Sequence, residues 1–408
     1  MLFKMAFRNI FRHTKRTLLT LVTIIFGIFF GIAGDGLNSG MKWQVADIYK
    51  NSMTSDFTLY KAGFFNLEED NEPLEYLYDF NTAKNLLADK NIKAYSEKLL
   101  FPGSITNSVE ELKVKFLGIT PEHEEKVFNR SSKLVSGTFL KGDSEEVVIG
   151  KGIADSLGLK TGDSVTITGR TAAKAINGYD CTVAGIISTG NPIVDNFYVF
   201  MKLDFAQSFA DCSGINGISV KTNSSSEKKL NSYISKNKEL LTNKNLEVIT
   251  WKDEIADLLA LVNFRGKIFS VITAVILIMA AAGIMNTMLM AMLERKKEIG
   301  IMCANGMSEK NILLLFTLEG GIIGAIGSTI AFVAGFIFVS YLQKHGIPFS
   351  AESTGIGNDF PINDRLYLYF EPLHAAVFYL LGIAVSTLSA LYPAAKAVKL
   401  EPVEAIRG

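Results

Sequence analysis

The apolar residues of this chain gather in four long stretches that are almost free of charge, whereas apolar and polar residues alternate more finely elsewhere. A helix needs roughly 20 apolar residues to cross the hydrocarbon core of a bilayer. The pattern therefore predicts membrane-spanning helices at residues 17–34, 265–293, 312–342 and 373–395.

The first stretch has an alternative interpretation as a cleaved signal peptide, since a basic leader precedes it and Gly31-Ile32-Ala33 resembles a cleavage site. Its apolar run is longer than the roughly 7–15 residues of a signal core. We therefore favour a retained membrane anchor.

Basic residues near the ends of the spans predict the orientation, because Lys and Arg concentrate on the cytoplasmic side. They form three groups: Lys4, Arg8, Arg12, Lys15 and Arg16 before the first span; Arg295, Lys296, Lys297 and Lys310 after the second; Lys396, Lys399 and Arg407 after the fourth. Residues 1–16, 294–311 and 396–408 are thus predicted to be cytoplasmic, and residues 35–264 and 343–372 extracytoplasmic.

Residues 1–16 also have a helical pattern. Phe3, Phe7, Ile10 and Phe11 fall on one face and the basic residues on another. We expect an amphipathic helix at the inner membrane interface. The alternative is a basic tail that only sets the topology.

Residues 35–264 have the shorter patterns of a soluble α+β domain. Strands are predicted at residues 55–61, 92–105, 112–120, 147–149, 164–168, 181–188, 197–202, 218–221 and 246–251, and helices at 82–89, 153–157 and 226–241. Phe101-Pro102-Gly103 is predicted to be a turn. Two lobes are plausible, with the middle strands inserted between the halves of a βαβ-like unit.

Composition excludes several classes of function. The formal net charge is zero, which gives no indication of a nucleic-acid partner. Cys181, Cys212 and Cys303 stand singly, without the spacing of a metal site. Cys181 and Cys212 could form a disulfide in an oxidising space, although two buried free thiols are the simpler interpretation.

No reactive constellation can be identified in the sequence. His123 stands alone in Glu122–Glu125, which we interpret as a solvated charged turn rather than a metal site. The phosphate-binding pattern GxxxxGK[ST] does not occur. The prediction is a chain without catalytic, cofactor-binding or metal-binding residues, which would have to obtain any ATP energy from another subunit.

Small residues mark candidate helix contacts within the spans. Gly27 and Gly31, and likewise Gly320 and Gly324, have the small-xxx-small spacing that lets helices approach closely, unless they are incidental membrane glycines. Glu319 lies inside the third span, where a carboxyl group needs a partner or water. We expect a structural hydrogen bond there, with a proton relay as the alternative.

The segment between the second and third spans is the most informative. It continues the second span through Glu294 and Glu298 and ends at the turn pair Asn305-Gly306. Ile299, Ile301 and Met302 would expose apolar surface on the cytoplasmic side. We therefore expect a protein partner here.

This segment resembles the motif ERxxEIGxLRAxGA of the FtsX-like, MacB-type permeases of ABC systems. The matching residues are Glu294, Arg295, Glu298, Ile299, Gly300, Ala304 and Gly306, whereas Cys303 and Met307 replace the usual arginine and alanine. The leader 6–17 and the end 392–407 are also similar to this family. Segments 149–163 and 183–190, with Asp195, resemble its LolC/LolE lipoprotein-releasing branch.

The resemblance implies four transmembrane helices and a Porter/Sabre-like extracytoplasmic domain, with Porter-like residues 45–117 and 214–255 and Sabre-like residues 118–213. It implies a second permease chain, identical or homologous, and two copies of an ABC ATP-binding subunit that binds ATP and Mg. Residues 294–306, with Ile301 and Met302, would be the coupling site. The substitution at Cys303 puts an inherited arginine contact in doubt.

The function implied is mechanotransmission in the bacterial inner membrane, where the chain contacts membrane lipid and acts on a lipoprotein or other envelope substrate. A lipoprotein is the favoured substrate. The alternatives are FtsX-like regulation of a cell-wall hydrolase or sensor, and MacB-like export of a small hydrophobic compound or peptide.

Overall fold

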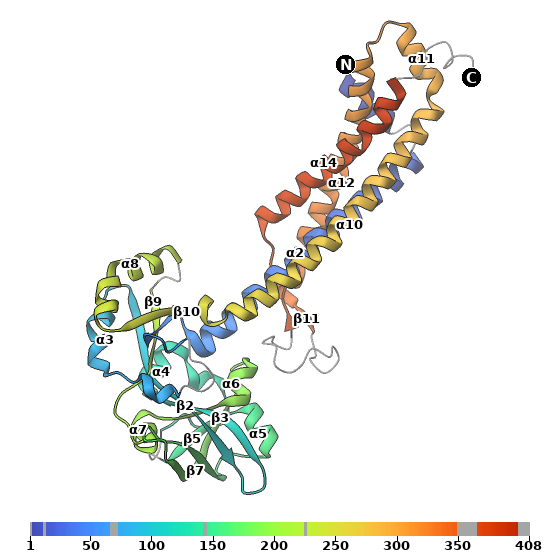
Figure 1. Ribbon diagram of the computed structural model, residues 1–408. Helices are drawn as coiled ribbons and strands as arrows, with labels where there is room; N and C mark the ends of the chain where they lie inside the picture. Colours follow the sequence, from blue (N-terminus) through green and yellow to red (C-terminus); the bar gives the residue numbers. More distant parts are fainter. Residues whose placement is uncertain are drawn as a thin grey trace. The chain divides into compact units, whose positions relative to one another are not determined.

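The computed structural model describes residues 2–10, 14–65, 72–141, 145–223, 227–348 and 365–398 (Figure 1). The chain forms two compact units: a helical unit of residues 1–43, 260–348 and 365–408, and an α/β unit built on residues 44–259. The predictions for Phe11, Arg12, Lys399, Arg407 and residues 349–364 lie outside the described residues.

The helical unit contains the four predicted spans. Its helices are α1 (Leu2–Ile10), α2 (Thr14–Tyr49), α10 (Ala256–Glu294), α11 (Lys296–Ala304), α12 (Glu309–His345) and α14 (Pro372–Val398). Strands β11 (Ile347–Pro348) and β12 (Arg365–Leu366) form a short hairpin-like pair. Four of the helices, α2, α10, α12 and α14, are long and apolar enough to cross a membrane.

Three of these helices are much longer than a bilayer requires. Helices α2, α10 and α12 have 36, 39 and 37 residues, which at 1.5 Å per residue is about 54, 58 and 56 Å against a core of about 30 Å. Helix α2 continues past Gly34, where its apolar stretch ends, to Tyr49. Hydrophobicity locates the membrane-crossing part of such a helix but not its end.

The α/β unit carries ten strands and seven α-helices in its described residues. The strands are β1 (Phe57–Lys61), β2 (Ile92–Thr106), β3 (Glu111–Ile119), β4 (Leu134–Gly137), β5 (Glu146–Gly150), β6 (Ser164–Arg170), β7 (Ile176–Ile187), β8 (Tyr198–Lys202), β9 (Gly217–Thr222) and β10 (Leu246–Thr250). The helices are α3 (Phe80–Leu87), α4 (Pro121–Phe128), α5 (Lys151–Leu157), α6 (Pro192–Phe197), α7 (Leu203–Ala210), α8 (Glu227–Asn243) and α9 (Trp251–Glu254).

A single sheet runs through the whole α/β unit, in the order β10-β1-β9-β2-β3-β8-β5-β7-β4. Strand β6 pairs with both β2 and β7, so β2, β3, β8, β5, β7 and β6 close a ring of strand pairs. The 15-residue strand β2 pairs with β9 in its first half and with β3 and β6 in its second half. The two lobes expected from the sequence therefore share one strand.

The predicted turn at Phe101-Pro102-Gly103 is wrong, because these residues lie within β2 and Pro102 is opposite Lys115 of β3. Gly103 is needed for packing rather than for a turn. A Cβ atom at Gly103 would lie 2.2 Å from the ring of Phe116 and 2.4 Å from the carbonyl oxygen of Thr168. Pro102 and Gly103 therefore allow two strands to approach closely and do not end the strand.

Apolar side chains on the two parts of the sheet form separate cores. One core joins the strand ring to α5 and α7 through residues such as Phe101, Ile149 and Phe209. A second packs β1 and β9 against α3 and α8, and a third packs β5 and β8 against α6. Cys181 is buried in the first core and, like Cys212, is a free thiol. Burial raises the pKa of the Cys181 thiol to about 12.

The expected solvated turn at Glu122–Glu125 is also wrong. These residues belong to helix α4, and Glu124 is 2% exposed. His123 is paired with Glu97 (Nδ1–Oε2, 2.7 Å). Pro121 at the first helical position and Asn129 in the left-handed region after the last turn favour a helix here.

Candidate coupling site

The segment between α10 and α12 folds into the short helix α11. Helix α10 ends at Glu294, Arg295 takes a non-helical conformation, and α11 runs from Lys296 to Ala304. Gly306 has φ +84°, a conformation that favours glycine after a helix end. The turn predicted at Asn305-Gly306 is therefore present, and it sets the direction in which the chain enters α12.

One face of α11 packs on the ends of the membrane helices. Ile299 is 1% exposed and lies in a cluster with Met292, Ile312, Phe316 and Ala394, against which Met302 packs. The expectation that Ile299 would be exposed is wrong. Ile301, by contrast, is 54% exposed. The apolar surface that α11 offers to a partner is therefore smaller than the sequence indicates.

Arg295 and Glu319 form a buried ion pair beneath α11. The Nη1 atom of Arg295 lies 3.2 Å from Oε1 and 3.4 Å from Oε2 of Glu319, and the two residues are 7% and 6% exposed. The Nε atom of Arg295 donates to Glu298 at 3.2 Å, and the guanidinium lies over the ring of Phe316. Arg295 therefore points into the helical unit and not toward a partner.

The leader helix joins the same group. Asn9 of α1 donates its side-chain amide to Oε1 of Glu319 at 2.6 Å. Asn9, Arg295, Glu298 and Glu319, hereafter the Glu319 network, thus connect α1, the start of α11 and α12. The structural hydrogen bond predicted for Glu319 is present. The ion pair with Arg295 was not predicted, because Arg295 lies just beyond the end of the second span and not among its apolar residues.

The coupling residues named from the sequence therefore fall into two groups. Arg295, Ile299 and Gly300 are buried, and Glu298 and Met302 are partly buried. Glu294, Ile301, Ala304 and Gly306 are exposed. The exposed group offers the largest surface that a second protein can contact.

The glycines named as helix contacts lie where helices approach each other. A Cβ atom at Gly31 would lie 2.9 Å from the ring of Phe378, and one at Gly27 would lie 3.3 Å from Leu277. At Gly320 the added atom would lie 2.5 Å from the Cβ of Ala390. Gly324 would meet Ser386 at 2.7 Å. Close approach of this kind stabilises helix pairs where hydrophobicity gives no driving force.

The LolC/LolE-like segments have a structural role in the α/β unit. A Cβ atom at Gly150 would lie 2.2 Å from the carbonyl oxygen of Asp195. The carboxylate of Asp195 accepts hydrogen bonds from the backbone N–H (2.8 Å) and hydroxyl (2.7 Å) of Thr189. These residues hold α5, α6 and the loop before α6 together. Among the described residues, no group of His, Cys, Asp and Glu is arranged to bind a metal ion.

The fold and this site define a class of protein: a polytopic membrane protein with a large α/β domain between its first and second spans and a short helix that links its second and third spans. Residues 17–234 match the family model of the MacB-like periplasmic core domain, and residues 270–402 match that of the FtsX-like permease C-terminal region. The chain belongs to this family of ABC transporter permeases.

Several curated proteins are similar to most of the chain. The ABC transporter permease MJ1507 of Methanocaldococcus jannaschii is 25% identical over 99% of this chain and 96% of its own length. The ABC transporter permease YtrF of Bacillus subtilis is 30% identical over 81% of this chain and 67% of its own. The lipoprotein-releasing system transmembrane protein LolC of Xylella fastidiosa is 24% identical over 71% of this chain and 72% of its own.

Membership of this family implies that the chain works with an ATP-binding partner subunit. The family also supports the extracytoplasmic location of the α/β domain, which lies between the first and second spans.

Proposed function

We propose that this chain is the non-catalytic permease of an ABC system in which a separate subunit hydrolyses ATP and the exposed side of α11 docks on that subunit. Both termini and α11 are cytoplasmic in this proposal, as the distribution of Lys and Arg favours. The observation that carries it is the two-sided character of α11, with Ile299 buried and Ile301 exposed.

An exposed isoleucine at the end of a membrane bundle is suited to a protein groove. Because Ile301 is 54% exposed, burying the rest of it would stabilise a complex by roughly 1–1.5 kcal/mol, about half of the value for a fully exposed side chain. The buried side of α11 is held by the Glu319 network, so a displacement of the docked helix is passed to α1 and α12. The proposed assembly has two ATP-binding subunits, which hold ATP and Mg, and a second permease chain that is identical or homologous.

For the substrate we propose a lipoprotein of the bacterial inner membrane. The support is the similarity to LolC proteins, together with the LolC/LolE-like segments around Gly150 and Asp195. Export of a small hydrophobic compound is a second candidate. It is favoured by 31% identity over 137 residues to the macrolide export ATP-binding/permease protein MacB of Haemophilus ducreyi, which is 34% of this chain and 17% of that protein.

Co-purification tests the proposal. The tagged full-length chain is expressed in its native host, and the ratio of the co-purified ATP-binding subunit to the chain is measured after solubilisation. Ile301→Asp is expected to reduce the bound subunit at least tenfold, whereas Ile301→Val, the matched control, retains it. Equal recovery with Ile301→Asp would refute docking through α11. Mass spectrometry of lipids and lipoproteins in the wild-type complex distinguishes the two substrates.

A further inference from the structure

Three buried charged residues and one partly buried one, Glu254, lie together in the α/β unit, next to the segment that follows α2. Lys98 of β2, Glu124 of α4, Arg130 and Glu254 of α9, hereafter the Arg130 cluster, line one small cavity. Lys98 is 8% exposed, Glu124 is 2% exposed and Arg130 is 2% exposed. Charges are so costly to bury that each of them needs a partner.

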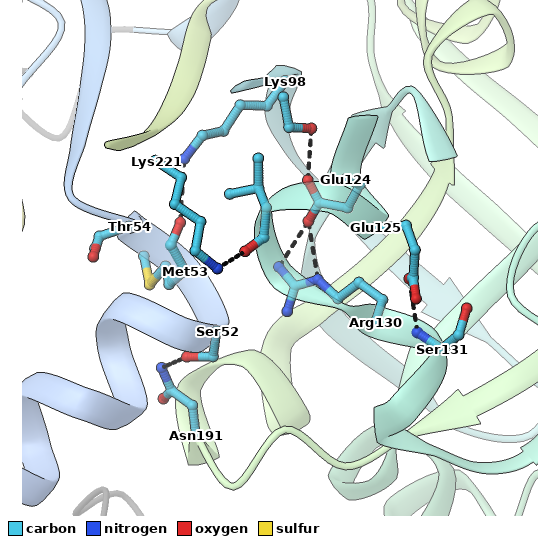
Figure 2. Close-up of polar contacts among 12 residues, drawn as sticks. Ser52, Met53, Thr54, Lys98, Glu124, Glu125, Arg130, Ser131, Asn191 and Lys221 are labelled. Carbon is cyan, nitrogen blue, oxygen red and sulfur yellow. Dashed lines mark hydrogen bonds and ion pairs between the residues drawn. The ribbon is translucent and has the colours of Figure 1, made fainter. Parts of the chain in front are cut away.

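Part of the cluster is well paired. The Nε and Nη2 atoms of Arg130 both lie 2.9 Å from Oε1 of Glu124, whose other oxygen accepts from Ser96 at 2.7 Å. Figure 2 shows Glu124 facing Arg130, and Lys98 reaching the carbonyl oxygen of Met53, at 3.3 Å. Met53 lies in the π-helical turn Lys50–Thr54 that continues α2.

Two polar atoms of the Arg130 cluster lack hydrogen-bond partners. Within the described part of the chain, Nη1 of Arg130 and Oε2 of Glu254 are buried and have no hydrogen-bond partner. The other oxygen of Glu254 accepts from the hydroxyl of Tyr60 at 3.0 Å. One unpaired atom is a donor and the other is an acceptor, and both belong to residues that line the same cavity.

The volume of the cavity and the charges around it favour water over an inorganic ion. The cavity measures about 30 Å³, and a water molecule needs roughly 10–15 Å³ measured in this way. Two cationic and two anionic side chains give the cluster no net charge, even if a proton moves from Lys98 to Glu254. An inorganic ion of either sign would meet like charge, whereas water both accepts and donates hydrogen bonds.

We propose that this cavity is an internal hydration site, in which one or two ordered water molecules accept from Nη1 of Arg130 and donate to Oε2 of Glu254. The water links α9, which leads directly into α10, to Arg130 after α4. Lys98 links the same cluster to the turn that ends α2. The ends of two long helices are thus fixed to strand β2 through a hydrated group of charges.

X-ray radiolytic footprinting of the full-length chain in lipid nanodiscs tests the site, because water held inside a protein yields hydroxyl radicals that label adjacent side chains. Tyr60 and Tyr198 line the cavity and are 4% and 3% exposed. Tyr233 is the matched control, since it is 5% exposed and its hydroxyl donates to the carbonyl oxygen of Leu86. Tyr60 and Tyr198 should be labelled at least threefold faster than Tyr233.

Equal and slow labelling of all three tyrosines would show a dry cavity and overturn the proposal. A saturable dependence of Tyr60 labelling on chloride, with gluconate as the replacement, would overturn it in favour of an anion. All of these comparisons use the wild-type chain, so none of them requires a variant of the cluster to fold. None of these results depends on the ATP-binding subunit.

Discussion

The Glu319 network and the Arg130 cluster both bury charged side chains, but they satisfy them differently. In the helical unit, Arg295 and Glu319 face each other directly, and Asn9 and Phe316 occupy the remaining sides. In the α/β unit, Arg130 and Glu254 leave polar atoms on a cavity. Direct pairing fixes one geometry, whereas water can exchange partners when side chains move.

The largest expected effect is at Arg295. Arg295→Met leaves Glu319 buried without its counter-charge, which should cost about 3–5 kcal/mol. The double variant Arg295→Met/Glu319→Leu removes both charges and should recover most of that loss. Thermal unfolding of the four members of this cycle in nanodiscs measures the coupling. Additive losses would mean that the pair does not act as a unit.

Arg130→Met gives the corresponding change in the α/β unit. Because the cavity lets water reach Glu124, the loss of stability should be about 1–3 kcal/mol, smaller than at Arg295. Chemical unfolding of the α/β domain within the full-length chain gives the value. A loss equal to or larger than that of Arg295→Met would remove the distinction between a direct and a hydrated group of charges.

Gly320 tests how closely the helices pack next to the Glu319 network. Gly320→Ala places a Cβ atom 2.5 Å from that of Ala390, and such overpacking should cost about 1–3 kcal/mol. Gly283→Ala in α10 is the control, because no atom lies within 4 Å of the added Cβ. The control should be neutral or stabilising, since alanine favours a helix over glycine. Equal melting temperatures for both variants would argue against a close contact between α12 and α14.

The smallest expected effect depends on pH. Burial raises the pKa of Asp56, but hydrogen bonds from Lys50 (2.8 Å) and Thr222 outweigh it and leave the pKa below its usual 3.8. The folded state therefore gains stability above pH 3.8 and loses it as the pH falls through the lowered pKa. Asp56→Asn should cost about 1 kcal/mol at pH 7 and flatten the acid side of the stability profile. An unchanged profile would mean that Asp56 does not contribute.

Local patterns predicted most of the elements. Alternating apolar residues located strands such as β2 and β9, and uncharged stretches located the four membrane helices, which the structure confirms. The ends of elements were less predictable. Helix α2 continues beyond its apolar stretch because its last turns, from Gln44 on, belong to the α/β unit, in which Val45 and Tyr49 are buried.

The errors arose where tertiary contacts override a local signal. Pro102 and Gly103 have the composition of a turn, yet packing against Phe116 places them in a strand. The charged residues around Glu124 suggest a solvated segment, but in the folded chain Arg130, six residues later, pairs with Glu124 and allows it to be buried. The pairing of Arg295 with Glu319 depends on the direction in which α11 leaves α10. No residue spacing in the sequence specifies that direction.

Crosslinking at position 301 tests the central claim most directly, namely that this chain receives the energy of ATP hydrolysis through α11. A photo-reactive amino acid replaces Ile301 in the full-length chain, with position 252 on α9 as the control. Illumination of the assembled complex should join position 301, but not position 252, to the ATP-binding subunit. Adducts only at position 252, or none at position 301 in an active complex, would contradict the account.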